Sequence, residues 1–130
     1  MAEAGGALIV VVEDEAIVLA GYQMLFESWG YRVVAAASAA DAMAQLQEVG
    51  EAPRFILADY RLKDGETGSD AIEILRKTYG QMIPSVLVTG DTAVDRLRNA
   101  AASGLPILHK PVNGRQLQDI LKRTLAPALA

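Results

Sequence analysis

The sequence contains no cysteine, a single histidine and few aromatic residues. The absence of cysteine excludes disulfides, Cys-ligated zinc and thiol catalysis, and a lone histidine makes a zinc or copper centre a weak hypothesis. Only 5% of the residues are aromatic although 52% are hydrophobic, so Ala, Val, Leu and Ile supply most of the apolar content. This balance favours helices packed on a buried parallel sheet, whose strands read as unbroken aliphatic runs.

Long apolar runs and an excess of positive charge are also missing. The apolar run at residues 7–12 is about half a membrane span, and Glu13, Asp14 and Glu15 follow it directly. We therefore expect no membrane contact, no signal peptide and, by default, a cytoplasmic location. The net charge of −4 disfavours nucleic-acid binding through a broad basic surface. The length of 130 residues suits one domain over 1–130, with its core at about 7–125 and loose ends at 1–6 and 126–130.

Short aliphatic runs alternate with longer segments of helical periodicity. The predicted strands are residues 7–12, 31–36, 55–58, 84–88 and 106–109. The predicted helices are residues 16–29, 38–49, 69–79, 92–103 and 113–125, with N-caps at Ser38 and Asn113 and helix-ending glycines at Gly30 and Gly50. This alternation predicts an α/β fold: a doubly wound, five-stranded parallel sheet flanked by five helices.

Polar residues stand where these strands end. Glu13 and Asp14 follow the first strand, Asp59 the third, Thr89 the fourth and Lys110 the fifth. The carboxyl ends of parallel strands meet at one edge of the sheet, which is where doubly wound folds bind ligands. Three carboxylates gathered there repel one another and call for a cation. Mg²⁺ suits the site because it accepts carboxylates and leaves room for phosphate oxygens.

This combination of groups is equipped for phosphoryl transfer. Asp59 would be the nucleophile and would form an acyl phosphate, Lys110 and Mg²⁺ would neutralise charge on the phosphoryl oxygens, and the Thr89 hydroxyl would donate a hydrogen bond to one of them. Taken singly, each residue has an ordinary explanation, such as a helix N-terminal acid, a turn former or a cap. Jointly, their placement at four strand ends favours function over coincidence.

The whole of residues 7–125 resembles the receiver domains of bacterial two-component signalling. The motifs that carry the resemblance are Glu13-Asp14, Ala58-Asp59-Tyr60, Val88-Thr89-Gly90 and His109-Lys110-Pro111, in that order. The resemblance implies that Asp59 accepts a phosphoryl group from the phosphohistidine of a histidine kinase or histidine phosphotransfer domain. It further implies Asp14 and Asp59 as direct Mg²⁺ ligands, Glu13 as a ligand through a water and the Arg61 backbone carbonyl as a further protein ligand. It also implies a flavodoxin-like fold with strand order 2-1-3-4-5.

The resemblance also implies that Thr89 is the switch hydroxyl, that Lys110 pairs with the phosphate and that a cis peptide joins Lys110 to Pro111. Several positions depart from the family pattern. Lys63 and a late Gly68 predict a longer or differently shaped loop after Asp59, and Gly90 leaves little bulk over the phosphate. Arg61 and Asp91 flank the site, and their opposite charges suggest a mutual contact. Ile107 replaces an aromatic residue that many receivers rotate on activation.

The remaining expectations concern subtype, partners and rival functions. The residues of the later motifs are most similar to those of receivers at the C-terminus of hybrid sensor kinases. The resemblance also implies that a homodimer, if one forms, uses the fourth and fifth helices. His109 is expected to face outward at the sheet end rather than to relay phosphate. One alternative is a degenerate receiver that only docks proteins. Another is a haloacid-dehalogenase-like phosphatase, whose second aspartate is here Arg61. A flavodoxin-like FMN module fits poorly because three acids occupy its phosphate loop.

Overall fold

The computed structural model describes residues 6–90, 98, 102 and 104–125. Five parallel strands form one sheet in the order β2-β1-β3-β4-β5, which confirms the predicted order. The register places Val10 of β1 between Val34 of β2 and Ile56 of β3, and Asp59 of β3 beside Val88 of β4. The strands are β1 (Leu8–Val12), β2 (Arg32–Ala36), β3 (Phe55–Asp59), β4 (Ser85–Thr89) and β5 (Ile107–His109).

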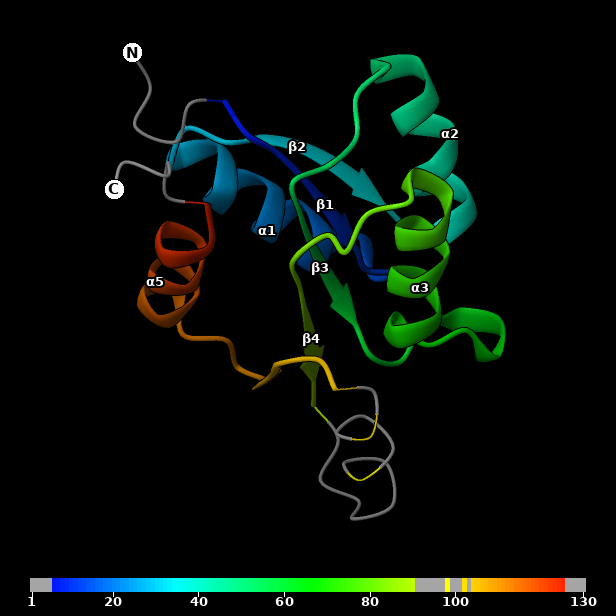
Figure 1. Cartoon of the computed structure of the whole chain (residues 1–130). Helices are drawn as coiled ribbons and strands as arrows, with labels where there is room; N and C mark the ends of the chain where they lie inside the picture. Colours follow the sequence, from blue (N-terminus) through cyan, green and yellow to red (C-terminus); the bar gives the residue numbers. More distant parts are fainter. Residues whose placement is uncertain (1–5, 91–97, 99–101, 103, 126–130) are drawn as a thin grey trace.

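Helices cover both faces of this sheet, as the sequence predicts. The described helices are α1 (Ala16–Ser28), α2 (Ala39–Val49), the short 3₁₀ helix η1 (Lys63–Gly65), α3 (Gly68–Tyr79) and α5 (Gly114–Leu125). In Figure 1, α2 and α3 lie on one side of the strands and α1 and α5 on the other. The predicted helix at residues 92–103 falls largely outside the described residues. Among the described residues, no helix combines the length and apolar character of a membrane span.

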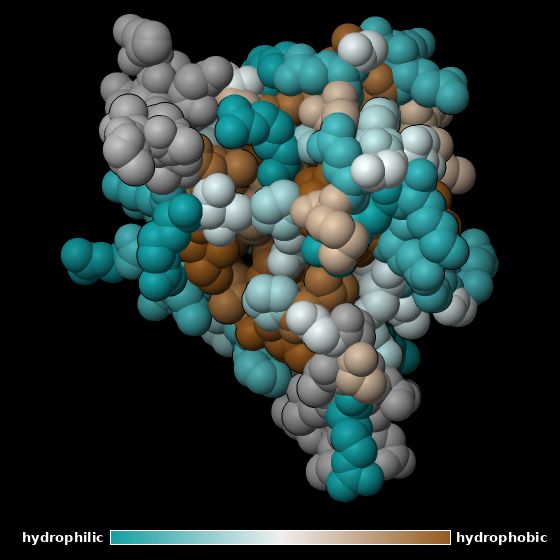
Figure 2. All heavy atoms as spheres, in the orientation of Figure 1, coloured by the Kyte–Doolittle hydropathy of each residue, from teal (hydrophilic) through white to brown (hydrophobic). Residues whose placement is uncertain are grey.

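The core consists of two apolar clusters, one on each face of the sheet. Side chains alternate between faces along a strand, so Val10 joins one cluster and Val11 the other. Leu46 of α2 and Leu75 of α3 pack with Val10. Phe26 of α1 packs with Val11, as do Leu117 and Leu121 of α5. Figure 2 shows apolar atoms in the middle of one face, bordered by hydrophilic ones.

Local sequence signals set most of the helix ends correctly. Ser38 accepts a hydrogen bond from the Asp41 amide at 3.1 Å, and Asn113 accepts one from the Gln116 amide at 3.1 Å. Gly50 ends α2 in the left-handed conformation at φ 75°, where glycine carries no side-chain penalty. Gly30, with φ 93°, directly follows the C-cap Trp29 of α1. These residues confirm the predicted caps.

Several element boundaries lie one residue from their predicted positions, and some contacts were not predicted. Gly6 was expected in a loose end, but its carbonyl accepts a 2.6 Å hydrogen bond from Arg32 Nε. Helix α3 begins at Gly68 rather than Ser69, because Thr67 and Asp70 form a reciprocal capping box. Thr89 lies inside β4 rather than beyond its end. Each difference depends on a contact that strand and helix periodicity does not encode.

Candidate metal and phosphoryl-transfer site

The sheet brings three predicted acids together at its carboxyl edge. Glu13 and Asp14 follow β1, and Asp59 is the last residue of β3, the strand that pairs with β1. One carboxylate oxygen from each lies within 4.8 Å of the others. Glu13 and Asp59 are buried, with 1% and 7% of their surface exposed. The acids therefore share one small, largely desolvated space, as the sequence predicts.

Glu13 has its two carboxylate oxygens in different environments. Oε2 accepts a hydrogen bond from the Glu15 amide at 3.1 Å. Oε1 is buried and, among the described residues, has no hydrogen-bond partner. The Lys110 ammonium lies 3.6 Å from Oε1, within ion-pair range but too far for a hydrogen bond. A buried carboxylate oxygen without a hydrogen bond is costly, and a cation in the shared space would satisfy it.

Lys110 brings the compensating positive charge to the acids. Its Nζ lies 3.3 Å from Asp59 Oδ1, and its side chain is 30% exposed. The Lys110 amide donates to the Thr89 carbonyl at 2.8 Å, which ties the ends of β4 and β5 together. The peptide bond between Lys110 and Pro111 is cis, as the resemblance implied. A Cβ on Gly90 would contact the Lys110 Cδ at 3.6 Å, so Gly90 borders this lysine.

Burial and crowding change the proton affinities of the site. Burial raises the pKa of Asp59 above its usual value; the Lys110 charge opposes this shift and the Asp14 charge reinforces it. Burial likewise raises the pKa of Glu13, although its hydrogen bond from the Glu15 amide works the other way. Burial alone would lower the pKa of Lys110, but the charges of Asp59 and Glu13 outweigh it and raise that pKa. The site thus favours extra positive charge.

Comparison of the chain with known proteins identifies its family. Residues 9–122 match the response regulator receiver domain. The chain belongs to this family. It is 32% identical over 119 residues to the transcriptional regulatory protein ZraR of Salmonella typhimurium, covering 91% of this chain and 26% of that protein. It is 30% identical over 122 residues to the sensor kinase CckA of Brucella abortus, covering 93% of this chain and 13% of that protein.

A solved structure agrees with this assignment. The CheY-like response regulator receiver domain protein from Methanospirillum hungatei is 27% identical, with a TM-score of 0.74 over 92% of this chain and 93% of that one. Receiver domains are the phospho-accepting signalling modules of two-component systems, and they generally bind Mg²⁺ at an acidic site. The acid group of Glu13, Asp14 and Asp59 lies at the equivalent edge of this receiver domain. The chain spans about a quarter of the length of ZraR, at 26%.

Thr89 ends β4, and Ile107 begins β5. Thr89 is 2% exposed and pairs in register with His109. Ile107 is partly buried and packs against the cluster that contains Leu87. His109 is exposed, in line with its predicted outward orientation. The predicted contact between Arg61 and Asp91 cannot be followed, because Asp91 lies outside the described residues.

The loop after β3, predicted to be longer or differently shaped, contains the short helix η1 and closes on itself. An antiparallel bridge joins Arg61 to Thr67, and Leu62 is buried at 9% exposure. A Cβ on Gly68 would lie 2.4 Å from the Asp59 carbonyl oxygen, so only glycine fits this close approach. Sequence reasoning noticed that Gly68 comes late but missed that it packs on the backbone of the acceptor residue. No local pattern reveals a contact of this kind.

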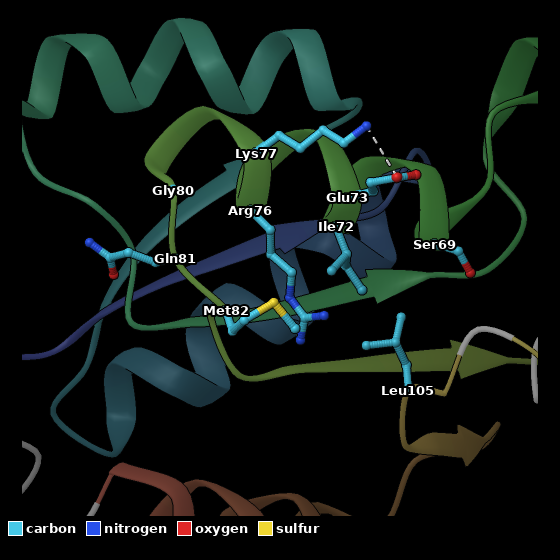
Figure 3. A pocket seen from close by; sticks show the side chains of 9 residues that line it. All are labelled: Ser69, Ile72, Glu73, Arg76, Lys77, Gly80, Gln81, Met82 and Leu105. Carbon is cyan, nitrogen blue, oxygen red and sulfur yellow. Dashed lines mark ion pairs between the residues drawn. The ribbon is translucent and has the colours of Figure 1, made fainter.

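A separate hollow of about 640 Å³ lies along α3, away from the acids. Figure 3 shows Ile72, Arg76, Met82 and Leu105 directed into it, while Lys77 pairs with Glu73 at its rim. The Arg76 Nε donates to the Ile83 carbonyl at 3.0 Å, which holds the guanidinium in place. None of the predicted site residues lines this hollow, so it is distinct from the acidic site.

Proposed function

We propose that Asp59 is the phospho-acceptor of this receiver domain and that its donor is a phosphohistidine. The observation that carries this proposal is the grouping of the Asp59, Glu13 and Asp14 oxygens within 4.8 Å, with the Lys110 ammonium 3.3 Å from Asp59. An Asp59 oxygen attacks phosphorus while the phosphorus–nitrogen bond to the donor breaks, and the imidazole leaves with that electron pair. Lys110 lies where it can balance charge on the transferred group.

The carboxylates fit Mg²⁺ as the resident cation. They offer hard oxygen ligands, and no described residue donates a hydrogen bond to the buried Glu13 Oε1. Within the proposal, Asp14 and Asp59 bind the ion directly, Glu13 acts through a water and Arg61 contributes its backbone carbonyl. Bound Mg²⁺ would supply positive charge to the transferring phosphoryl oxygens. Thr89, at the buried end of β4, is the proposed switch hydroxyl that donates to the phosphorylated Asp59.

The phosphoryl donor is proposed to dock on helix α1. This helix starts two residues after Asp14 and leaves Ile17 and Met24 89% and 71% exposed. Residues seven apart lie on the same face of a helix. Large exposed apolar side chains beside a reactive site are typical of a protein-binding surface. A histidine kinase or histidine phosphotransfer domain would cover them while presenting its phosphohistidine to Asp59.

The other predictions about the chain remain proposals. We propose one receiver domain over 1–130, a cytoplasmic location, no nucleic-acid partner, no membrane contact, a hybrid-kinase subtype and, where a homodimer forms, a face that includes α5. We also propose that the domain catalyses only its own phosphorylation and slow dephosphorylation. Arg61, whose side chain is exposed, stands where a haloacid-dehalogenase-like phosphatase would need an acid. Steady hydrolysis of a phosphate ester such as p-nitrophenyl phosphate would favour that alternative.

Phosphorylation can be tested directly with a small donor. We expect incubation with acetyl phosphate and Mg²⁺ to add one phosphoryl group by intact mass, and to add none after removal of Mg²⁺ or in Asp59→Asn. Asp64→Asn is the matched control, because Asp64 is exposed and its φ of 62° suits asparagine. Equal labelling of Asp59→Asn and wild type would contradict the assignment. The absence of any labelling, under conditions where Mg²⁺ binds, would favour a degenerate docking receiver.

Docking of the donor can be tested separately from the chemistry. We expect Ile17→Asp to slow transfer from a phosphorylated histidine phosphotransfer domain while leaving labelling by acetyl phosphate unchanged. The reason is that Ile17 is exposed on α1 and belongs to neither core cluster. Ile74→Asp on α3, where the isoleucine is 41% exposed, is a control for a new charge on another helix. Equal transfer rates for the two variants would count against α1.

A further inference from the structure

The loop after β3 is closed on itself. The Leu62 amide donates to the Glu66 carbonyl at 3.0 Å, and the Gly68 amide donates to the Tyr60 carbonyl at 2.9 Å. Between them, Asp64 and Gly65 turn the chain with φ of 62° and 78°. The Arg61 carbonyl, proposed above as a metal ligand, therefore belongs to a compact, internally hydrogen-bonded turn.

The two ends of this turn are held by the sheet and by α3. The Tyr60 amide donates to the Val88 carbonyl of β4 at 2.8 Å. At the other end, Thr67 accepts a hydrogen bond from the Asp70 amide at 3.1 Å, and the Asp70 carboxylate accepts one from the Thr67 amide at 3.3 Å. These contacts anchor the two ends of the turn, and Leu62 within it is buried at 9% exposure.

A third anchor comes from the Glu66 side chain. Glu66 Oε1 accepts a hydrogen bond from the amide of Ala39, the first residue of α2, at 3.3 Å. First-turn amides of a helix lack intrahelical partners, and the positive end of the helix dipole favours a carboxylate there. Glu66 is half-buried and Ala39 is 2% exposed, so the contact is partly shielded from water.

The start of α2 is in turn connected to the acids. Strand β2 ends at Ala36, shortly before α2 begins, and the Ala36 carbonyl accepts the Glu13 amide at 3.0 Å. Glu66 thus links the turn that carries Arg61 to the strand end that supports Glu13. From this connection we propose that Glu66 is a positioning residue of the metal site, which sets the Arg61 carbonyl relative to Glu13 and Asp14. This inference rests on the proposed function.

Three variants separate positioning from charge. Glu66→Ala removes both the tether and a negative charge. We expect it to raise the Mg²⁺ dissociation constant roughly tenfold, the lower end of what loss of an outer partner costs a metal site. Glu66→Gln removes the charge but keeps a side-chain oxygen for the Ala39 amide. We therefore expect its Mg²⁺ dissociation constant to stay within about twofold of the wild-type value. Glu66→Asp keeps the charge but is too short, and we expect it to resemble Glu66→Ala.

The measurement is calorimetric titration of Mg²⁺ into the full chain, together with amide hydrogen exchange of the metal-free protein. The Ala39 amide should exchange faster in Glu66→Ala and Glu66→Asp but not in Glu66→Gln. Glu48→Ala, an exposed change on α2, is the matched control and should alter neither quantity. If Glu66→Ala fails to fold, Glu66→Asp carries the same test.

The possible failures are distinguishable. Wild-type protein that binds no Mg²⁺ would overturn the proposed function itself. Wild-type binding with an unchanged dissociation constant in Glu66→Ala and Glu66→Asp would overturn only the positioning role. Equal weakening in Glu66→Gln and Glu66→Ala would overturn it too, because charge rather than the tether would then be responsible.

Discussion

Strands β1 and β3 are buried at both of their ends, but the two ends differ in chemistry. The amino ends of the strands form the amino edge of the sheet, and the carboxyl ends form the carboxyl edge. At the amino edge, Leu8 and Phe55 are 2% and 1% exposed and pack in the apolar core. At the carboxyl edge, Glu13 and Asp59 are 1% and 7% exposed but carry carboxylates. The same strands, β1 and β3, reach both edges. Burial at the first edge stabilises the fold, whereas at the second it concentrates negative charge that favours a cation or a bound proton.

The largest expected effect concerns the tight packing beneath the carboxyl edge. Gly68→Ala should destabilise the protein by about 2 kcal/mol, because the new Cβ would meet the Asp59 carbonyl oxygen at 2.4 Å and the backbone would have to move. Urea unfolding measures this loss. Gly21→Ala is the control, since a Cβ at that exposed position of α1 has nothing within 4 Å. It should stabilise the helix by roughly 0.5–1 kcal/mol. Similar behaviour of the two variants would show that the close approach is absent.

Removing one buried charge should make the carboxyl edge behave more like the amino edge. Asp59→Asn should raise the free energy of unfolding of the metal-free protein by about 1 kcal/mol at neutral pH, because it removes a carboxylate whose pKa burial has raised. It should also lower the gain in stability that Mg²⁺ gives. Asp64→Asn, in the exposed turn, should change neither value. A destabilised Asp59→Asn would mean that the contact with Lys110 outweighs the crowding of the acids.

The dependence of stability on pH should expose the same contrast. The pKa values of Asp59 and Glu13 are raised in the folded state, so between their unfolded and folded values the folded protein binds more protons. Stability from these groups is therefore present at acidic pH and is lost as pH rises through the folded values. Thermal unfolding without Mg²⁺ should show this decline, and saturating Mg²⁺ should weaken it. A rise over that range, in the metal-free protein, would contradict the assignment.

The smallest effect is expected at the surface near the amino edge. Arg32 pairs with Glu51 at 2.6 Å, but the two side chains are 51% and 42% exposed. An exposed ion pair of this kind contributes at most about 1 kcal/mol, and salt screens it. Arg32→Ala should therefore lower the free energy of unfolding only slightly. The loss should be somewhat larger than for the ion pair alone, because the hydrogen bond from Arg32 to the Gly6 carbonyl is also lost. Denaturant unfolding at low and high salt measures this loss of stability. The affinity for Mg²⁺ should be unaffected.

Much of this molecule follows from short-range patterns. Aliphatic runs and helical periods predicted a parallel sheet covered by helices on both faces, because side-chain periodicity decides which face is buried. The acids were predicted to meet because the carboxyl ends of parallel strands share one edge. Ser38 and Asn113 cap their helices through hydrogen bonds to residues only three positions along the chain, so the sequence predicted their role as well.

Contacts between segments that are far apart in the sequence could be found only in the folded structure. The Glu66 carboxylate meets the Ala39 amide across 27 residues of sequence, and Gly68 approaches the Asp59 backbone only because α3 folds back against β3. Neither contact has a period or a motif. By itself the sequence determined, to within a residue, where buried strands end and which charged residues stand there, since both depend on local composition. Tertiary structure alone decided how near the acids lie, which Glu13 oxygen has no hydrogen bond within the described part of the chain and what anchors the loop. These features depend on packing between elements.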